Sequence, residues 1–292
     1  MADNKKIVLL TGSTAGIGRA AAKALANQGF HVVCVARDAG KATRLVDELG
    51  HDRASALIAD LSRPADVARV AREFAERHER LDVLFNNAGA LFIERRVTED
   101  GLERTFALNH MSYFVLSVML LDLLKASAPA RVVSTSSHAH RQGGLDCLDD
   151  LQTERWDLTG MRAYGRSKLA NIWFTVELTR RLEGTGVTAN CFHPGFVASD
   201  FARNNGIVAT VAMTISRPLQ RSVEQGADTG VWLASAPEVA SVTGGYFYEH
   251  KRRKGTRAAR DPHAPARLWR ESERIAESIL GDGWASRARG TH

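Results

Sequence analysis

The chain has 292 residues, of which 44% are hydrophobic and 25% are charged, and its formal net charge at pH 7 is +6. This composition is typical of a globular protein with a sizeable core, and it excludes a disordered or low-complexity chain. No apolar run approaches the roughly 18 residues that a membrane span needs, and the first residues lead directly into a strand without a signal peptide. We therefore expect a cytoplasmic protein without membrane contact.

The three cysteines, Cys34, Cys147 and Cys191, lie far apart in the sequence. An odd number of cysteines without metal-ligand spacing favours buried thiols over a disulfide framework or a zinc site. We therefore expect no bound metal.

Strand-like and helix-like segments alternate along most of the chain. Strands are expected at residues 6–10, 31–36, 54–59, 81–86, 131–135, 187–192 and 244–248. Helices are expected at residues 16–28, 40–49, 64–78, 101–124, 164–182 and 223–235. This alternation predicts an α/β fold with a doubly wound, parallel, seven-stranded sheet of the Rossmann type. No linker or internal repeat divides the chain, so we expect a single domain over residues 1–292 with its core at 5–250.

A glycine-rich turn, Thr-Gly-Ser-Thr-Ala-Gly-Ile-Gly at 11–18, follows the first expected strand. Glycines let the backbone approach a pyrophosphate, and the next helix points its N-terminus at that anion. Because the turn directly follows the first strand of an α/β chain, it favours dinucleotide binding over an ordinary tight turn. The expected contacts are Gly12, Ser13, Thr14, Gly16, Ile17 and Gly18.

The end of the second expected strand indicates which dinucleotide binds. Enzymes that use NAD place a carboxylate there, whereas enzymes that use NADP place an arginine against the 2′-phosphate. The first polar residue in this sequence is Arg37, and a guanidinium pairs well with a phosphate. The next residue, Asp38, is expected to turn outward or to cap the following helix. We therefore predict NADP(H) as the cofactor.

Tyr164 and Lys168 lie four positions apart in a segment of helical periodicity, so they share one face of the expected helix. An ammonium group beside a phenol favours the phenolate and lowers the pKa of the tyrosine. Such a tyrosine can exchange a proton with a carbonyl oxygen. The pair therefore predicts proton-transfer chemistry, provided that other motifs support it.

Three motifs together resemble the classical short-chain dehydrogenase/reductase (SDR) family. They are TGxxxGIG at 11–18, Asn-Asn-Ala-Gly at 86–89, and Tyr164 with Lys168. Further matches are Asp60-Leu61, Asn109, Ser137 and the segment 194–199. The resemblance covers roughly residues 5–280 and implies an oxidoreductase.

Within that family, the sequence is similar to the retinol dehydrogenase branch at residues 136–140, 163–171, 186–188 and 193–195. Extra residues between Ser137 and Tyr164 are shared with that branch. Its members carry an N-terminal membrane anchor, whereas we expect none in this protein, and this expectation weighs against retinoids and other membrane-borne substrates.

The resemblance implies that Asn109, Ser137, Tyr164 and Lys168 form the catalytic set. Tyr164 would donate the proton during reduction, and Ser137 would orient the carbonyl. Lys168 would lower the pKa of Tyr164 and bind the nicotinamide ribose. Asn109 would hold a water molecule that links Lys168 to solvent.

The choice of serine rests on the pattern, because Ser134, Ser136 and Ser137 lie in one run at a strand end. Any of these hydroxyls could instead satisfy backbone groups. Alignment with the family favours Ser137 over Ser136. His138 and His140 lie where the family has loop residues, so we place them outside the proton path.

The resemblance also implies further cofactor contacts. Asp60 would contact the adenine amino group, and residues 87–89 would line the adenosine side of the binding site. Asn86-Asn87 could instead form a plain turn. The full additional set is Asp60, Leu61, Asn87, Ala88, Gly89, Tyr164, Lys168, Pro194, Gly195, Val197 and Ser199.

Residues 200–221 are expected to form a lid over the substrate. Their middle, 207–215, is apolar and uncharged. It would favour a hydrophobic carbonyl or alcohol, or it could pack as a subunit contact. The family implies a homodimer or homotetramer.

The C-terminal residues 250–292 hold eleven Lys/Arg and five Asp/Glu, which accounts for the whole net charge. We expect 251–292 to be a basic tail that contains a helix. Without interleaved aromatic residues, its basic run 251–254 favours a solvated surface over nucleic-acid binding.

Two functions of different class fit the sequence. One is an NADP(H)-dependent oxidoreductase that interconverts a hydrophobic aldehyde or ketone and its alcohol. The other is a non-catalytic NADP-binding sensor or scaffold, which needs the glycine turn but not the catalytic set. The complete set of Asn109, Ser137, Tyr164 and Lys168 favours the enzyme.

Overall fold

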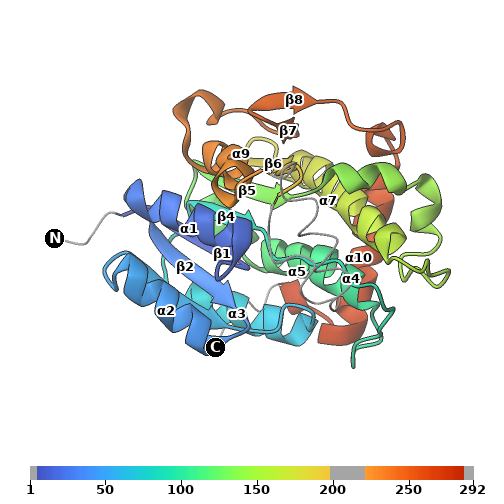
Figure 1. The fold of residues 1–292 in the computed structure, drawn as a ribbon, viewed down its shortest axis with the longest axis horizontal. Helices are drawn as coiled ribbons and strands as arrows, with labels where there is room; N and C mark the ends of the chain where they lie inside the picture. Colours follow the sequence, from blue (N-terminus) through green and yellow to red (C-terminus); the bar gives the residue numbers. More distant parts are fainter. Residues whose placement is uncertain (1–4, 198–220, 286–292) are drawn as a thin grey trace.

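The computed structural model describes residues 5–197 and 221–285, and within them the strands form one eight-stranded sheet (Figure 1). The strands are β1 (Ile7–Thr11), β2 (His31–Ala36), β3 (Ala54–Ile58), β4 (Val83–Asn86), β5 (Ala130–Thr135), β6 (Val187–Phe192), β7 (Tyr246–Tyr248) and β8 (Lys251–Arg253). Their order is β3-β2-β1-β4-β5-β6-β7-β8, with every neighbouring pair parallel except β7 and β8. The predicted α/β fold with seven parallel strands is confirmed.

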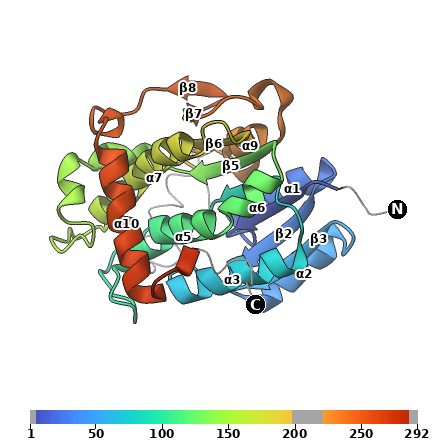
Figure 2. The same ribbon diagram turned by 180° about the vertical axis from the view of Figure 1, so that it is seen from behind.

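Helices cover both faces of the sheet (Figures 1 and 2). On one face, α1 (Gly16–Asn27), α2 (Ala39–Leu49) and α9 (Val223–Ser235) share an apolar cluster with the strands. On the other face, α3 (Pro64–Arg77), α5 (Ser112–Met119) and α7 (Met161–Arg181) do the same. Strands buried on both faces are apolar throughout rather than alternating, which is why Val8, Leu9 and Leu10 of β1 are all fully buried.

The shorter helical elements connect these layers. They are α4 (Arg104–Phe106), a π-helical segment (Ala107–Met111), α6 (Leu121–Ala126), and the 3₁₀ helices His138–Gln142, Leu145–Leu148, Pro237–Val239 and Ala258–Arg260. Among the helices in the described ranges, none is long and apolar enough to cross a membrane.

The direction of winding reverses at β1, which pairs with β2 on one side and with β4 on the other. In a doubly wound sheet, a crevice opens beyond the carboxyl ends of the strands at this reversal. The glycine turn follows β1 and residues 87–89 follow β4, so the topology brings both motifs to this crevice.

The single helix expected at 101–124 is wrong, because the helical run begins at Arg104 and divides into α4, the π-helical segment, α5 and α6. Glu103 fixes the start, since its carboxylate accepts hydrogen bonds from the amides of Thr105 and Phe106 at 2.6 and 2.8 Å. The run is interrupted at Leu120, whose backbone leaves the helical region with φ −95° and ψ 6°. Similarly, α7 begins at Met161 rather than at Tyr164.

The antiparallel strand β8 was not expected, because its three exposed basic residues carry no alternation of apolar and polar side chains. Charged side chains on an edge strand discourage pairing with another chain. The basic run is therefore exposed, as expected, but it is also an ordered part of the sheet.

The described part of the C-terminal tail after β8, up to residue 285, packs on the body of the protein. Its helix α10 (Ala264–Leu280) packs against α7 and α3 and buries Leu268 and Trp269 (Figure 2). The Trp269 ring stacks on Phe174 at a centroid distance of 6.0 Å and meets Phe114 edge-on at 4.9 Å. A chain cut after Tyr248 would therefore lose part of its core.

We predict that Trp269→Ala lowers the free energy of unfolding by about 3–5 kcal/mol, because it empties a site between α7 and α5. Urea unfolding of the full chain measures this loss. The control is Arg270→Ala on the exposed face of the same helix, for which the change should stay within about 0.5 kcal/mol. Equal losses in the two variants would contradict the assignment of α10 to the core.

Candidate active site

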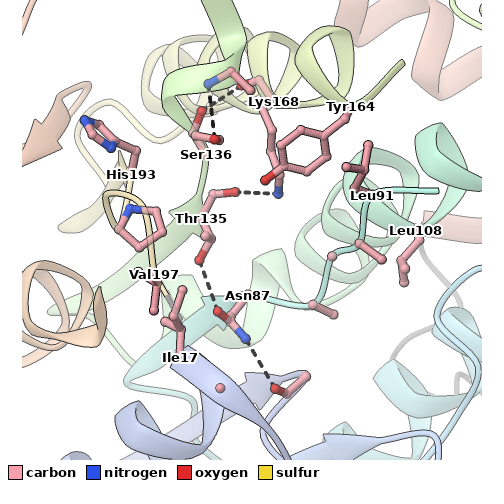
Figure 3. A pocket seen from close by; sticks show the side chains of 18 of the residues that line it. Ile17, Asn87, Leu91, Leu108, Thr135, Ser136, Tyr164, Lys168, His193 and Val197 are labelled. Carbon is pink, nitrogen blue, oxygen red and sulfur yellow. Dashed lines mark hydrogen bonds between the residues drawn. The ribbon is translucent and has the colours of Figure 1, made fainter. Parts of the chain in front are cut away.

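A cleft of about 1690 Å³ lies at the carboxyl ends of the parallel strands (Figure 3). Its lining includes the glycine turn, the residues after β4 and β5, one face of α7 and the segment after β6. Sites for a single small molecule commonly measure about 300–1000 Å³. The cleft therefore has room for a dinucleotide and a second molecule side by side.

The glycine turn is locked to the end of β4. Gly12 has φ +67°, and a Cβ atom there would lie 2.8 Å from the Cα atom of Ala88. The amide of Asn87 donates through Nδ2 to the carbonyls of Thr11 and Gly12 at 3.0 and 3.3 Å (Figure 3). The two segments thus form one rigid wall, and glycine is required where they meet.

The N-terminus of α1 faces this wall. Its N-cap position is Ala15, whose side chain has no oxygen that could accept from the first free amides of the helix. Free amides at a helix N-terminus bind anions such as a pyrophosphate. The residues that line the cleft here fit the predicted dinucleotide.

Among the described residues, all predicted cofactor contacts except Ser13 line the cleft. The lining members are Gly12, Thr14, Gly16, Ile17, Gly18, Arg37, Asp60, Leu61, Asn87, Ala88, Gly89, Tyr164, Lys168, Pro194, Gly195 and Val197. Ser199 and the expected lid at 200–220 lie outside the described residues. The side chain of Ser13 is fully buried beside the thiol of Cys34 and is not part of the lining, so its predicted cofactor contact stays a prediction.

Two predicted polar contacts already have partners within the protein. Asp60 accepts through Oδ1 from the amide and the hydroxyl of Ser62 at 3.0 and 2.7 Å. Asn87 is occupied by its hydrogen bonds to the glycine turn. Both side chains therefore shape the wall of the cleft as well as lining it.

The end of β2 presents cations to the cleft. Arg37 and Lys41 both line it, whereas Asp38 accepts from the amide of Lys41 at 2.9 Å and caps α2, as expected. Arg104 also lines this region, with its guanidinium 3.6 Å from the centre of the Phe92 ring. No sequence motif pointed to Arg104.

The catalytic candidates Tyr164 and Lys168 project from α7 toward the end of β5 (Figure 3). Lys168 Nζ donates to the carbonyl of Thr135 at 3.1 Å and lies 5.6 Å from the centre of the Tyr164 ring. Ser137 lines the cleft and hydrogen-bonds Tyr164. Ser136 instead donates to the carbonyl of Lys168 at 2.8 Å, so its hydroxyl serves the backbone.

Asn109 lies in the π-helical segment and is completely buried. Its Oδ1 accepts from the amide of Ala90 at 2.9 Å, and its Nδ2 donates to the Ala90 carbonyl and to the Ser167 hydroxyl, both at 3.0 Å. Its side chain therefore braces the segment after β4 against α7. The predicted role in holding a water molecule stays a prediction.

Burial acts on the two ionisable groups of α7 in opposite directions. It raises the pKa of Tyr164 to about 12, which the hydrogen bond with Ser137 partly opposes, and it lowers the pKa of Lys168 to about 7. Removal from water disfavours both phenolate and ammonium. In this structure desolvation of the phenol sets the direction of the Tyr164 pKa shift, and the expected lowering of that pKa by Lys168 stays a prediction.

A buried chain of hydrogen bonds that the sequence did not reveal connects this site to α10. His110 meets Ser272 of α10 through Nε2 at 2.9 Å and Asn171 of α7 through Nδ1 at 3.3 Å. Asn171 in turn donates to the carbonyls of Asn109 and Thr135 at 2.8 and 3.3 Å. Thr135 is also the acceptor for Lys168, so the C-terminal helix supports the catalytic face of α7.

We predict that His110 makes stability depend on pH. Burial lowers its pKa from 6.5 to about 4, so below pH 6.5 the unfolded chain binds a proton that the folded chain does not. This contribution to stability is complete above pH 6.5 and falls by about 2 kcal/mol between pH 7 and pH 5.

Urea unfolding at the two pH values measures this effect in the wild type and in His110→Gln. The stability advantage of the wild type should shrink by about 2 kcal/mol at pH 5. An advantage that stays constant with pH would contradict the assignment of a neutral, buried His110.

The short chain dehydrogenase model matches residues 6–148. Retinol dehydrogenase 13 from Homo sapiens is 38% identical over 279 residues, which cover 92% of this chain and 84% of the relative. This chain belongs to the short-chain dehydrogenase family. Retinol dehydrogenase 12 from Mus musculus is 37% identical over 283 residues, 96% of this chain and 87% of that protein. The WW domain-containing oxidoreductase from Homo sapiens is 37% identical and matches 94% of this chain and 69% of the relative.

Solved structures share the fold of this dehydrogenase. An uncharacterised protein from Mycobacterium paratuberculosis superposes with a TM-score of 0.75 at 28% identity, covering 93% of both chains. A short chain dehydrogenase from Burkholderia cenocepacia, solved in complex with NADP, has a TM-score of 0.65 at 29% identity and covers 83% of this chain and 95% of its own.

Proposed function

We propose that this short-chain dehydrogenase is an NADP(H)-dependent oxidoreductase that interconverts a hydrophobic aldehyde or ketone and its alcohol. The observation that carries the proposal is the hydrogen-bonded pair of Ser137 and Tyr164, which faces the cleft beside Lys168. Both hydroxyls can reach one substrate oxygen, which is the arrangement that reduction of a carbonyl needs.

The cofactor would lie with its phosphates at the glycine turn and its adenosine between Arg37 and Asp60. The free amides at the N-terminus of α1, where the N-cap Ala15 has no side-chain oxygen, support this placement of the phosphates. The cofactor supplies a hydride, which adds to the carbonyl carbon during reduction and leaves from the carbinol carbon during oxidation.

During reduction, Tyr164 donates its hydroxyl proton to the substrate oxygen while Ser137 donates a hydrogen bond to that oxygen. With a pKa raised to about 12, the phenol holds its proton at neutral pH until the oxygen becomes basic. Lys168, with a pKa lowered to about 7, exchanges its own proton near neutrality and so suits the reprotonation of Tyr164. In the oxidation, the same proton moves in reverse.

The apolar side of the cleft supports a hydrophobic substrate. Leu91, Ile93 and Met161 line it together with Leu158 and Phe196. The last two are unusually exposed for apolar side chains, at 95% and 52%. Exposed apolar side chains that gather at a cleft mark a place for an apolar ligand. Relatives such as retinol dehydrogenases 13 and 12 are named for an alcohol of this kind.

We predict that Tyr164→Phe lowers kcat for the reduction of an aldehyde such as octanal by about 10²–10⁴-fold, because the proton donor is lost. NADPH oxidation at 340 nm measures the rate. Binding of NADPH, followed by its fluorescence, should change by less than twofold and shows that the variant is folded. Full turnover by the variant would exclude Tyr164 as the donor.

We predict that Arg37→Asp lowers the preference for NADPH over NADH, expressed as the ratio of kcat/KM values, by about 10–100-fold. The carboxylate repels the 2′-phosphate and accepts from the free ribose hydroxyl of NADH. The matched control is Arg44→Asp, an equal change of charge on the exposed side of α2, outside the cleft. If both variants shift the ratio equally, Arg37 does not bind the 2′-phosphate.

A further inference from the structure

One end of the cleft is lined by aromatic rings that the proposed hydride and proton transfers do not use. His193 at the end of β6 stacks on Tyr248 of β7 at a centroid distance of 4.1 Å and an angle of 6°. His138 lies 5.7 Å from His193, and the Tyr246 ring lies at the same distance on another side. All four residues line the cleft, and His138 directly follows the catalytic candidate Ser137.

The protonation of His193 is fixed by its surroundings. The amide of Gly195 donates to Nδ1 at 3.2 Å, so the neutral ring carries its hydrogen on Nε2. Burial, with the charges of the nearby histidines and of Arg253 and Arg221, lowers the pKa of His193 to about 4. Within the described residues, no acceptor takes the Nε2 hydrogen. His193 therefore offers a neutral hydrogen-bond donor at the cleft.

Two cationic side chains, those of Arg253 and Lys254, lie beyond this cluster of aromatic rings. Arg253 ends β8 and pairs in register with Tyr246, and its guanidinium lies 5.7 Å from the centre of the Tyr248 ring. Lys254 follows it, and both line the cleft. Neither forms an ion pair with a carboxylate in the described parts of the chain, whereas the neighbouring Arg221 is bound to Glu249 and to the Tyr248 hydroxyl.

Arg253 and Lys254 are too far from the predicted positions of the cofactor phosphates to bind them. The phosphate-binding turn follows β1, and five strand spacings separate β1 from β8 across the sheet. At about 4.8 Å for each spacing, the separation is about 24 Å. Ser137 follows β5, only three spacings or about 14 Å from β8. The cations therefore belong to the substrate side of the cleft.

We propose that the substrate of this enzyme is amphipathic: an apolar chain that carries the reacting carbonyl or alcohol at one end and a carboxylate at the other. Arg253 and Lys254 bind the carboxylate, and His193 donates to it through Nε2. In the strand order, β6 and β7 lie between the two ends, and the cleft-lining side chains Pro194 and Phe196 after β6, with the rings of Tyr246 and Tyr248 on β7, hold the chain there. This inference rests on the proposed oxidoreductase function and adds a substrate class to it.

The test compares n-aldehydes of eight, ten and twelve carbons with ω-oxo carboxylates of the same lengths, as substrates for NADPH oxidation. The wild type should prefer the carboxylate of at least one length by tenfold or more in kcat/KM. Arg253→Gln should lower that preference at least tenfold. Lys251→Gln removes the same charge from the same strand outside the cleft, so it should leave the preference unchanged.

Three results would overturn the inference: neutral aldehydes preferred at every length, a preference that Arg253→Gln leaves intact, or equal effects of the two variants. Isothermal titration of the NADP-loaded protein with octanoate provides a readout without turnover. Arg253→Gln should weaken octanoate binding at least tenfold, and a larger loss of NADPH affinity than of octanoate affinity would assign Arg253 to the cofactor and overturn the proposal.

Failure of the proposed function gives a different pattern. If neither series of aldehydes is reduced, the oxidoreductase assignment to these substrates has failed, and the octanoate titration decides the inference by itself. Binding that depends on Arg253 supports a carboxylate subsite, and binding that does not depend on it refutes one.

Discussion

The site depends on the hydrogen bond from Lys168 to the backbone carbonyl of Thr135. This bond fixes α7 against the end of β5, so that a residue one helical turn earlier, Tyr164, comes to the hydroxyl of Ser137. Two further hydrogen bonds hold the same register: Ser136 donates to the carbonyl of Lys168, and Asn171 donates to the carbonyl of Thr135. Three side chains, those of Lys168, Ser136 and Asn171, therefore secure one contact between a helix and a strand end.

Burial gives this arrangement its chemistry. Because the phenol and the ammonium are both withdrawn from water, each is pushed toward its neutral form, with pKa values of about 12 and about 7. The tyrosine is then a proton donor that does not ionise beforehand, and the lysine is a group that exchanges protons near neutrality. The proton transfer in the proposed reaction follows from these opposed shifts more than from attraction between the two groups.

Much of the fold could be predicted from the sequence, because buried parallel strands are continuous apolar runs and glycines are needed where the backbone approaches an anion. The strand β8 could not be predicted, because its three exposed basic residues show no alternation of buried and exposed side chains. The role of α10 could not be predicted either, because its contacts join residues far apart in the chain, such as Ser272 and His110. The periodicity of residues 101–124 concealed a π-helical segment and a break at Leu120.

Prediction of the site succeeded where a side chain type is dictated by its chemistry and failed where orientation decides. Tyr164, Lys168 and Ser137 come together as their spacing and family pattern indicated. Ser13 is fully buried beside Cys34, and the sequence of the glycine turn did not indicate which of its side chains are buried. The electrostatic outcome also needed the structure, since the depth of burial around Tyr164 cannot be read from spacing.

We propose that this cleft transfers a hydride between a nicotinamide and a carbonyl carbon. Reduction of octanal with NADPH that carries two deuterium atoms at C4 of the nicotinamide tests it most directly, with the product followed by ²H NMR. The account predicts one deuterium atom on the carbinol carbon of octanol and none when the unlabelled cofactor is used. An alcohol product without deuterium at that carbon would contradict hydride transfer in this cleft.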